Sequence, residues 1–214
     1  MIVLSGTIGA GKTSLTNLLS NHLGSKAIYE SVSDNPILPL FYDDPKKYAF
    51  LLQIYFLNKR LQNIKNAQDN KLDVIDRSIF EDALLFQLNA DLGRSTQTEV
   101  DIYKSLLSNM MEKLDELPSK DPDLLIHVRV SFDNMLNRIQ KRGRGFEQIS
   151  VHPDLYKYYQ ELNRRYSIWY ASYDRGPKME IDGDKYDFVE SKDAAQEVLN
   201  QIDEKLFNLG ILVG

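Results

Sequence analysis

The 214-residue chain contains no cysteine, which excludes a disulfide framework, a thiolate zinc site and a cysteine nucleophile. Its three histidines (His22, His127 and His152) lie far apart and show no metal-ligand spacing. Long apolar runs are also missing, since none approaches the roughly 18 uncharged apolar residues that span a bilayer. No secretory signal is readable in the apolar start, which is only a few residues long. We therefore expect a cytoplasmic protein with no membrane partner.

Positive charge is not in excess, because 26 Lys and Arg residues face 31 Asp and Glu residues, for a net charge of −5. No global field attracts nucleic acid, so we expect no nucleic-acid partner. The composition, 43% hydrophobic and 27% charged, is that of an ordinary globular protein. The length suffices for one well-buried α/β domain, whereas two would each be small. We expect residues 1–214 to form a single domain.

Apolar, β-branched runs alternate with amphipathic helical stretches along the chain. This pattern is typical of a parallel sheet covered by helices. The predicted strands lie near residues 2–5, 26–29, 72–76, 123–130 and 178–182. The predicted helices lie near residues 12–23, 45–68, 79–92, 97–116, 131–142, 154–174 and 190–208. The fold class is therefore α/β, with a five-stranded parallel sheet flanked by helices.

The most informative motif is G-x-x-x-x-G-K-T, which consists of Gly6, Thr7, Ile8, Gly9, Ala10, Gly11, Lys12 and Thr13. It lies between a short apolar run and leucines at helical spacing, which is the strand–loop–helix context of a phosphate loop. The loop N–H groups and the helix N-terminus bind an anion, Lys12 reaches the β- and γ-phosphates, and Thr13 ligates Mg²⁺. The motif predicts binding of a nucleoside triphosphate; a glycine turn that merely caps a helix is the weaker alternative.

Polar residues follow three of the predicted strands, at the carboxyl ends where open parallel sheets bind ligands: Glu30, Asp76-Arg77 and Asp182. Glu30 can accept a proton from an attacking hydroxyl, although a surface glutamate is the alternative. Asp76 stands where a Mg²⁺-holding acid is expected, and Arg77 beside it can bridge the transferred phosphoryl group and the base. Ser78 and Glu81 fit a capping box, so both also have a purely structural interpretation.

The concentrated basic segment of the chain contains Arg138, Arg142 and Arg144. The first two are four residues apart and share one helical face. A basic loop with glycines predicts a short lid at about residues 141–150, whose arginines neutralise charge in the transition state. A solvated charged loop is the alternative.

A second set of side chains is of the kind that binds a base. Gln53 and Arg60, seven residues apart, share a face of the predicted helix 45–68, and Tyr42 precedes it. Asp82 and Phe86 share a face of the next helix. Together such groups can hydrogen-bond a base edge and stack on its ring. Each alone is more often a packing or surface residue.

In this order along nearly the whole chain, these motifs resemble the deoxyribonucleoside kinase family. The resemblance rests on the phosphate loop, Tyr29-Glu30-Ser31-Val32, the segment 53–60, Asp76-Arg77-Ser78 and the segment 138–144. It looks closest to the bacterial, lactobacillus-type branch that acts on deoxyadenosine and deoxyguanosine, with further matches at 35–40 and 181–185. The resemblance implies a P-loop kinase fold and Mg²⁺-dependent transfer of phosphate from ATP to the 5′-hydroxyl of a purine deoxyribonucleoside, in nucleotide salvage.

The resemblance also implies residue roles. The catalytic residues would be the general base Glu30 and the arginines Arg77, Arg138, Arg142 and Arg144. The residues that bind the deoxynucleoside would be Glu30, Tyr42, Gln53, Arg60, Arg77, Asp82, Phe86 and Glu147. Asp187 and Phe188 would lie near the adenine of ATP. Many members carry Glu where this chain has Asp76, so the shorter side chain holds Mg²⁺ either directly or through water.

Assembly and regulation are implied in the same way: a homodimer, or a heterodimer with a related subunit, inhibited by a deoxynucleoside triphosphate. Two rival functions stay open. A thymidylate-type nucleoside monophosphate kinase shares many of these motifs, but Glu30 would repel the phosphate of its acceptor. A nucleotide-dependent switch would carry Asn-Lys-x-Asp or Asp-x-x-Gly signatures, and neither stands at the required place.

Replacement of the predicted base tests the reaction class. Glu30→Gln should bind ATP as the wild type does, because the phosphate loop is untouched, but turnover should fall at least about a hundredfold. Single-turnover kinetics with a deoxynucleoside acceptor would measure the loss. Near-normal turnover would remove Glu30 from the role of base.

Overall fold

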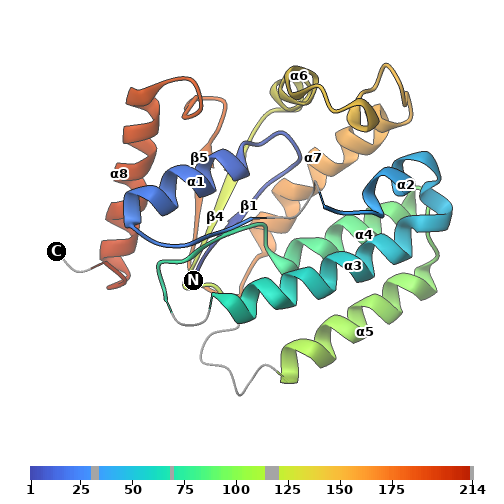
Figure 1. Cartoon of the computed structure of the whole chain (residues 1–214), viewed down its shortest axis with the longest axis horizontal. Helices are drawn as coiled ribbons and strands as arrows, with labels where there is room; N and C mark the ends of the chain where they lie inside the picture. Colours follow the sequence, from blue (N-terminus) through green and yellow to red (C-terminus); the bar gives the residue numbers. More distant parts are fainter. Residues whose placement is uncertain (30–33, 68–69, 114–120, 213–214) are drawn as a thin grey trace.

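The computed structural model describes residues 1–29, 34–67, 70–113 and 121–212. Within these ranges it contains a five-stranded sheet in the order β2-β3-β1-β4-β5, all of whose pairings are parallel (Figure 1). The strands are β1 (Ile2–Ser5), β2 (Ala27–Ile28), β3 (Val74–Asp76), β4 (Leu124–Arg129) and β5 (Lys178–Asp182). The predicted α/β class and the five parallel strands are confirmed.

The helices occupy most of the ranges that the sequence predicts. They are α1 (Lys12–Leu23), α2 (Leu38–Asp43), α3 (Pro45–Asn66), η1 (Ile79–Glu81), α4 (Asp82–Asp91), α5 (Gln97–Lys113), α6 (Phe132–Arg142), η3 (Gly145–Glu147), α7 (Leu155–Ser172) and α8 (Lys192–Asn208). The sequence did not predict α2 and η3, which are too short to show a helical period. The predicted helix 79–92 begins instead as the 3₁₀ turn η1.

Side-chain caps fix several helix starts. The Asp44 carboxylate accepts a hydrogen bond from Lys47 N at the start of α3. Ser131 and Ser191 cap α6 and α8 in the same way. These residue types are favoured at helix N-termini because their oxygens satisfy backbone N–H groups that have no partner within the helix.

Apolar side chains cover both faces of the sheet. Ile2 and Leu4 of β1 belong to the core cluster that includes residues of α1 and α8, whereas Val3 belongs to the cluster that includes α3 and α5. Figure 1 shows α1 and α8 together on one side of the sheet and α3, α4 and α5 on the other. Successive side chains of β1 thus point to opposite faces of the sheet and enter two apolar layers, as expected for a parallel sheet that is buried on both faces. In the described part of the chain, no helix is both long and apolar enough to cross a membrane.

The sheet brings two of the predicted motifs together. Leu4 of β1 pairs with Asp76 of β3, so the phosphate loop and Arg77 leave neighbouring strands at the same edge. Arg77 has a φ of 97°, and no other non-glycine residue within the described ranges has a positive φ. Such backbone strain persists where the surrounding structure holds it, commonly at functional sites.

Gly6 gives a stability test of the loop geometry. Its φ is 140°, and a Cβ atom would lie 2.6 Å from the Val128 carbonyl oxygen. Gly6→Ala should lower the free energy of unfolding by at least about 3 kcal/mol, because strain and overpacking add. The control Gly24→Ala changes a glycine with φ 60° and open space around it, so it should lose only about 1–2 kcal/mol. Urea denaturation measures both, and equal losses would contradict the close packing at Gly6.

Candidate active site

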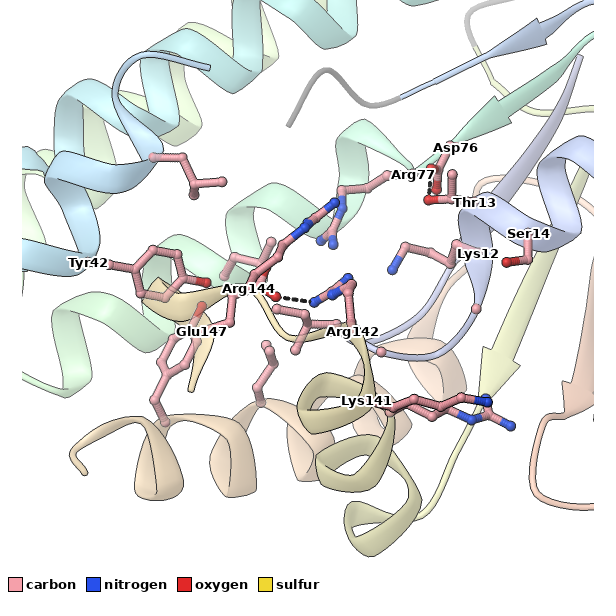
Figure 2. A pocket seen from close by; sticks show the side chains of 18 of the residues that line it. Lys12, Thr13, Ser14, Tyr42, Asp76, Arg77, Lys141, Arg142, Arg144 and Glu147 are labelled. Carbon is pink, nitrogen blue, oxygen red and sulfur yellow. Dashed lines mark hydrogen bonds and ion pairs between the residues drawn. The ribbon is translucent and has the colours of Figure 1, made fainter. Parts of the chain in front are cut away.

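A cavity of about 740 Å³ opens at the carboxyl edge of the sheet (Figure 2). The phosphate loop and Asp76-Arg77 line one end of it, and side chains of α2, α3, α4 and α7 line the other. The α6–η3 segment and the loop after β5 complete the wall. Residues from far-apart segments of the sequence therefore surround one space large enough for small-molecule substrates.

The phosphate-loop end carries converging cations. Lys12 is 7% exposed, and its Nζ donates hydrogen bonds to the carbonyl oxygens of Gly6 (2.8 Å) and Thr7 (2.9 Å). Figure 2 shows Lys12, Arg77 and Arg142 extending into the same part of the cavity. Three cations around one space, beside the N-terminus of α1, form a site for a polyanion.

Thr13 and Asp76 form a pair suited to a hard cation. The Thr13 hydroxyl donates to Asp76 Oδ2 at 2.6 Å, while the buried Oδ1 has no hydrogen-bond partner within the described ranges. Hydroxyl and carboxylate oxygens are Mg²⁺ ligands, and an unpartnered buried oxygen is satisfied by a bound cation. These two residues therefore fit the predicted metal site.

The basic segment differs in detail from the predicted lid. Helix α6 continues through Arg142, so the loop itself begins at Gly143 and includes η3. Arg142 Nη2 donates to Glu147 Oε2 at 2.5 Å, and Arg144 Nη1 lies 3.4 Å from the other oxygen. Arg138 donates to the carbonyl oxygens of Ala10 (3.1 Å) and Gly183 (2.7 Å). Arg138 thus links the phosphate loop to the loop after β5, whereas the other two arginines are paired with Glu147.

Tyr42 and Glu147, both predicted to bind the deoxynucleoside, lie on the same wall of the cavity (Figure 2). Glu147 is 2% exposed, and its carbonyl oxygen accepts a hydrogen bond from the Tyr159 hydroxyl at 3.0 Å. Burial, together with the neighbouring Tyr159, raises the pKa of Tyr42 well above its ordinary value. Tyr42 is therefore a neutral hydroxyl that can donate or accept a hydrogen bond at neutral pH.

The opposite end holds a buried polar group of the predicted type. Arg60 Nε donates to Asp82 Oδ2 at 3.1 Å, and the two residues are 2% and 0% exposed. Gln53, 3% exposed, lines the cavity together with Arg60, and its Oε1 accepts no hydrogen bond from the described part of the chain. A buried acceptor without a donor is costly unless a ligand or water satisfies it. This end can therefore read a polar base edge.

Two residues that were predicted to contact a ligand do not line the cavity. Phe86 is 0% exposed, with Tyr103 and Phe50 rings 5.5 and 6.1 Å away, and it does not line the cavity. It belongs to the apolar cluster between α4 and α5, and the ring that lines the cavity from α3 is Phe56. Phe188 does not line the cavity either, and its buried ring packs against the phosphate loop, 3.2 Å from the position of a Cβ on Gly11. Its neighbour Asp187 does line the cavity.

Glu30, the predicted general base, lies outside the described residues. The sequence also missed cavity residues, notably Asn89 of α4 and Tyr158 and Leu162 of α7. The last two are four residues apart on a helix whose other apolar residues are core, so periodicity alone could not distinguish them. Asn89 had a weak signal, because it lies seven residues after Asp82 on the same helical face.

The phosphate loop, the Thr13–Asp76 pair and the converging cations define a P-loop phosphotransferase. The deoxynucleoside kinase family model matches residues 2–208, and the chain belongs to this family. It is an ATP-dependent kinase of deoxynucleosides. The predicted family is confirmed, and the monophosphate-kinase and switch alternatives are set aside.

Named relatives agree with this assignment. The chain is 61% identical to a deoxyguanosine kinase of Lactobacillus johnsonii, over 98% of this chain and 94% of the relative. It is 55% identical to a deoxyadenosine kinase of Lactobacillus acidophilus, over 99% of both. A structure of deoxyadenosine kinase from M. mycoides with bound dCTP superposes with a TM-score of 0.77 at 30% identity, covering 95% of this chain and 100% of that one.

The Arg142–Glu147 pair makes the role of the basic segment testable. Arg142→Ala should lower kcat at least about tenfold, because a cation near the phosphate-loop end no longer neutralises developing charge. Arg164→Ala is the control, since Arg164 is 58% exposed and pairs with Glu161 on the outside of α7. Steady-state kinetics and thermal melts of both variants are needed. A kcat for Arg142→Ala equal to that of the control would contradict the lid function.

Proposed function

We propose that the enzyme transfers the γ-phosphoryl group of ATP to the 5′-hydroxyl of a purine deoxynucleoside, with deoxyguanosine preferred over deoxyadenosine, and so serves nucleotide salvage. The observation that carries the proposal is a cavity lined by two kinds of side chain. Lys12, Arg77 and Arg142 extend into one part of it (Figure 2), and the buried Gln53 and Arg60 also line it. A triphosphate fits the cations, and a base fits the hydrogen-bonding side chains.

The transfer is a displacement at phosphorus. The 5′-oxygen bonds to the γ-phosphorus, the bond to the β–γ bridging oxygen breaks, and ADP leaves with that electron pair. Glu30 takes the hydroxyl proton, late in the step because an alcohol is far less acidic than a carboxylic acid. Lys12, Arg77 and Arg142 stabilise the charge on the phosphoryl oxygens, which is the larger share of catalysis in such reactions.

Thr13 and Asp76 would hold Mg²⁺, and the unpartnered Asp76 Oδ1 supports this role. When bound, the ion neutralises phosphate oxygens and aligns them for transfer. The protein's own contribution is the short hydrogen bond between the two side chains, which fixes the carboxylate next to the phosphate loop.

Guanine is the better match to the base end on two grounds. Two deoxyguanosine kinases of Lactobacillus are 61% and 60% identical to the chain, against 55% for the deoxyadenosine kinase. The Gln53 Oε1 acceptor also suits the N–H donors of guanine, while the Arg60 guanidinium suits its O6 acceptor. Tyr42 and Glu147 would bind the deoxyribose 3′-hydroxyl.

Three features of assembly, regulation and location belong to the same proposal. The chain would form a homodimer or pair with a related subunit, and the exposed Leu51 of α3 and Ile102 of α5 support an interface there. A deoxynucleoside triphosphate would inhibit the enzyme, and a structure of the M. mycoides deoxyadenosine kinase contains dATP. The enzyme would act in the cytoplasm.

A comparison of acceptors tests the proposal. ATP-dependent phosphorylation of the four deoxynucleosides should give kcat/KM values for deoxyguanosine and deoxyadenosine at least about tenfold above those for the pyrimidines, because a mismatched base leaves buried polar groups unpaired. The control acceptors dTMP and dAMP should not react. Turnover on pyrimidines alone would overturn the purine preference, and turnover on a monophosphate alone would overturn the role of Glu30.

A further inference from the structure

Glu81 does more than the capping box requires. As predicted, Phe80 N donates to Ser78 Oγ (3.1 Å), and Ser78 N donates to Glu81 Oε1 (2.9 Å). The Glu81 residue, however, is 0% exposed. A capping glutamate normally stays near solvent, since glutamate is almost never fully buried without partners. Its burial calls for contacts beyond the cap.

The second carboxylate oxygen contacts the phosphate loop. Glu81 Oε2 accepts a hydrogen bond from Gly6 N at 3.1 Å, across 75 residues of sequence. Gly6 begins the loop after β1, and Ser78 follows Arg77 after β3, which are neighbouring strands paired at Leu4 and Asp76. One carboxylate therefore joins the two segments that carry the phosphate-binding groups.

The Tyr166 hydroxyl lies between Glu81 and the Arg77 side chain. Arg77 Nη1 donates to this hydroxyl at 3.1 Å. Burial, and next the nearby negative charge of Glu81, raise the pKa of Tyr166 well above its ordinary value. Tyr166 therefore stays a neutral hydroxyl beside Glu81 and holds the guanidinium of Arg77 near that carboxylate.

The backbone at Arg77 needs such support. Arg77 is a non-glycine residue with a φ of 97°, and such a strained position persists only where its surroundings over-determine it. Glu81 binds the N–H of Ser78, the residue after Arg77, and the N–H of Gly6 at the start of the phosphate loop. Its two bonds therefore act next to the strained residue and at the loop itself.

We propose that Glu81 is a positioning residue, whose carboxylate fixes the phosphate loop relative to Arg77 so that both act on the same phosphoryl group. This inference rests on the proposed function, since it takes the loop and Arg77 as the groups that contact the transferred phosphate. A displacement of about 1 Å in a reacting constellation can cost about a hundredfold in rate. Loss of the carboxylate should therefore reduce kcat more than substrate affinity.

Glu81→Gln is the direct test, because the amide keeps the shape but turns an NH₂ group toward one of the two N–H donors. We expect kcat to fall about 10- to 100-fold, while KM for the deoxynucleoside changes less than about threefold. Ser78→Ala is the matched control, since it removes the other half of the cap and leaves both Glu81 bonds. Its kcat should stay within about twofold of the wild type. Equal kcat values for the two variants would mean that Glu81 only caps the helix and does not position the phosphate loop.

Tyr166→Phe keeps the inference testable should Glu81→Gln not fold. It removes only the hydroxyl, and kcat should fall about fivefold or more, with the double variant losing less than the product of the single losses. An unchanged kcat for Tyr166→Phe would overturn the link to Arg77. A wild-type enzyme that phosphorylates no deoxynucleoside would reject the proposed function instead. Wild-type activity with unaffected Glu81→Gln and Tyr166→Phe variants would reject only the role of Glu81.

Discussion

The parallel pairing of β1 with β3 is the constraint on which the site depends. Because Leu4 pairs with Asp76, the residues that follow each strand leave the sheet side by side. This register gives the 2.6 Å contact of Thr13 with Asp76 and the 3.1 Å contact of Gly6 with Glu81. A shift of one residue in the register would turn Asp76 to the other face of the sheet and separate both pairs.

Charge balance is the second organising factor. Several cations are needed around a triphosphate, and each repels the others when no anion is present. Here Glu147 pairs with Arg142 and Arg144, while carbonyl oxygens accept hydrogen bonds from Lys12 and Arg138. These partners are of the kind that phosphate oxygens can replace, because both are hydrogen-bond acceptors. The protein's own acceptors thus hold these cations in place around the site.

Much of the fold was predictable from sequence because its signals are local. The phosphate loop, the strand runs and the capping residues each depend on a few consecutive side chains, and the structure contains them where the pattern indicated. Phe86 could not be placed in this way. Its helical face is shared with Asp82, but whether the ring faces the cavity or α5 depends on Tyr103, which is distant in sequence. The cavity residues of α7 were hidden for the same reason, since an apolar helical face lines a core and a pocket alike.

Under the proposed function, the buried Arg60–Asp82 pair serves to discriminate between bases more than to stabilise the fold. Both residues are nearly inaccessible, and burying an ion pair costs desolvation that its attraction only roughly repays. Apolar side chains of similar volume would fill this space at least as stably. They would, however, offer a base no fixed donors or acceptors. Because Gln53 and Arg60 are polar at the cavity wall, a base with the wrong pattern of donors and acceptors leaves buried groups unpaired. The free-energy penalty of these unpaired groups can exceed the difference in binding energy between two bases in an apolar pocket.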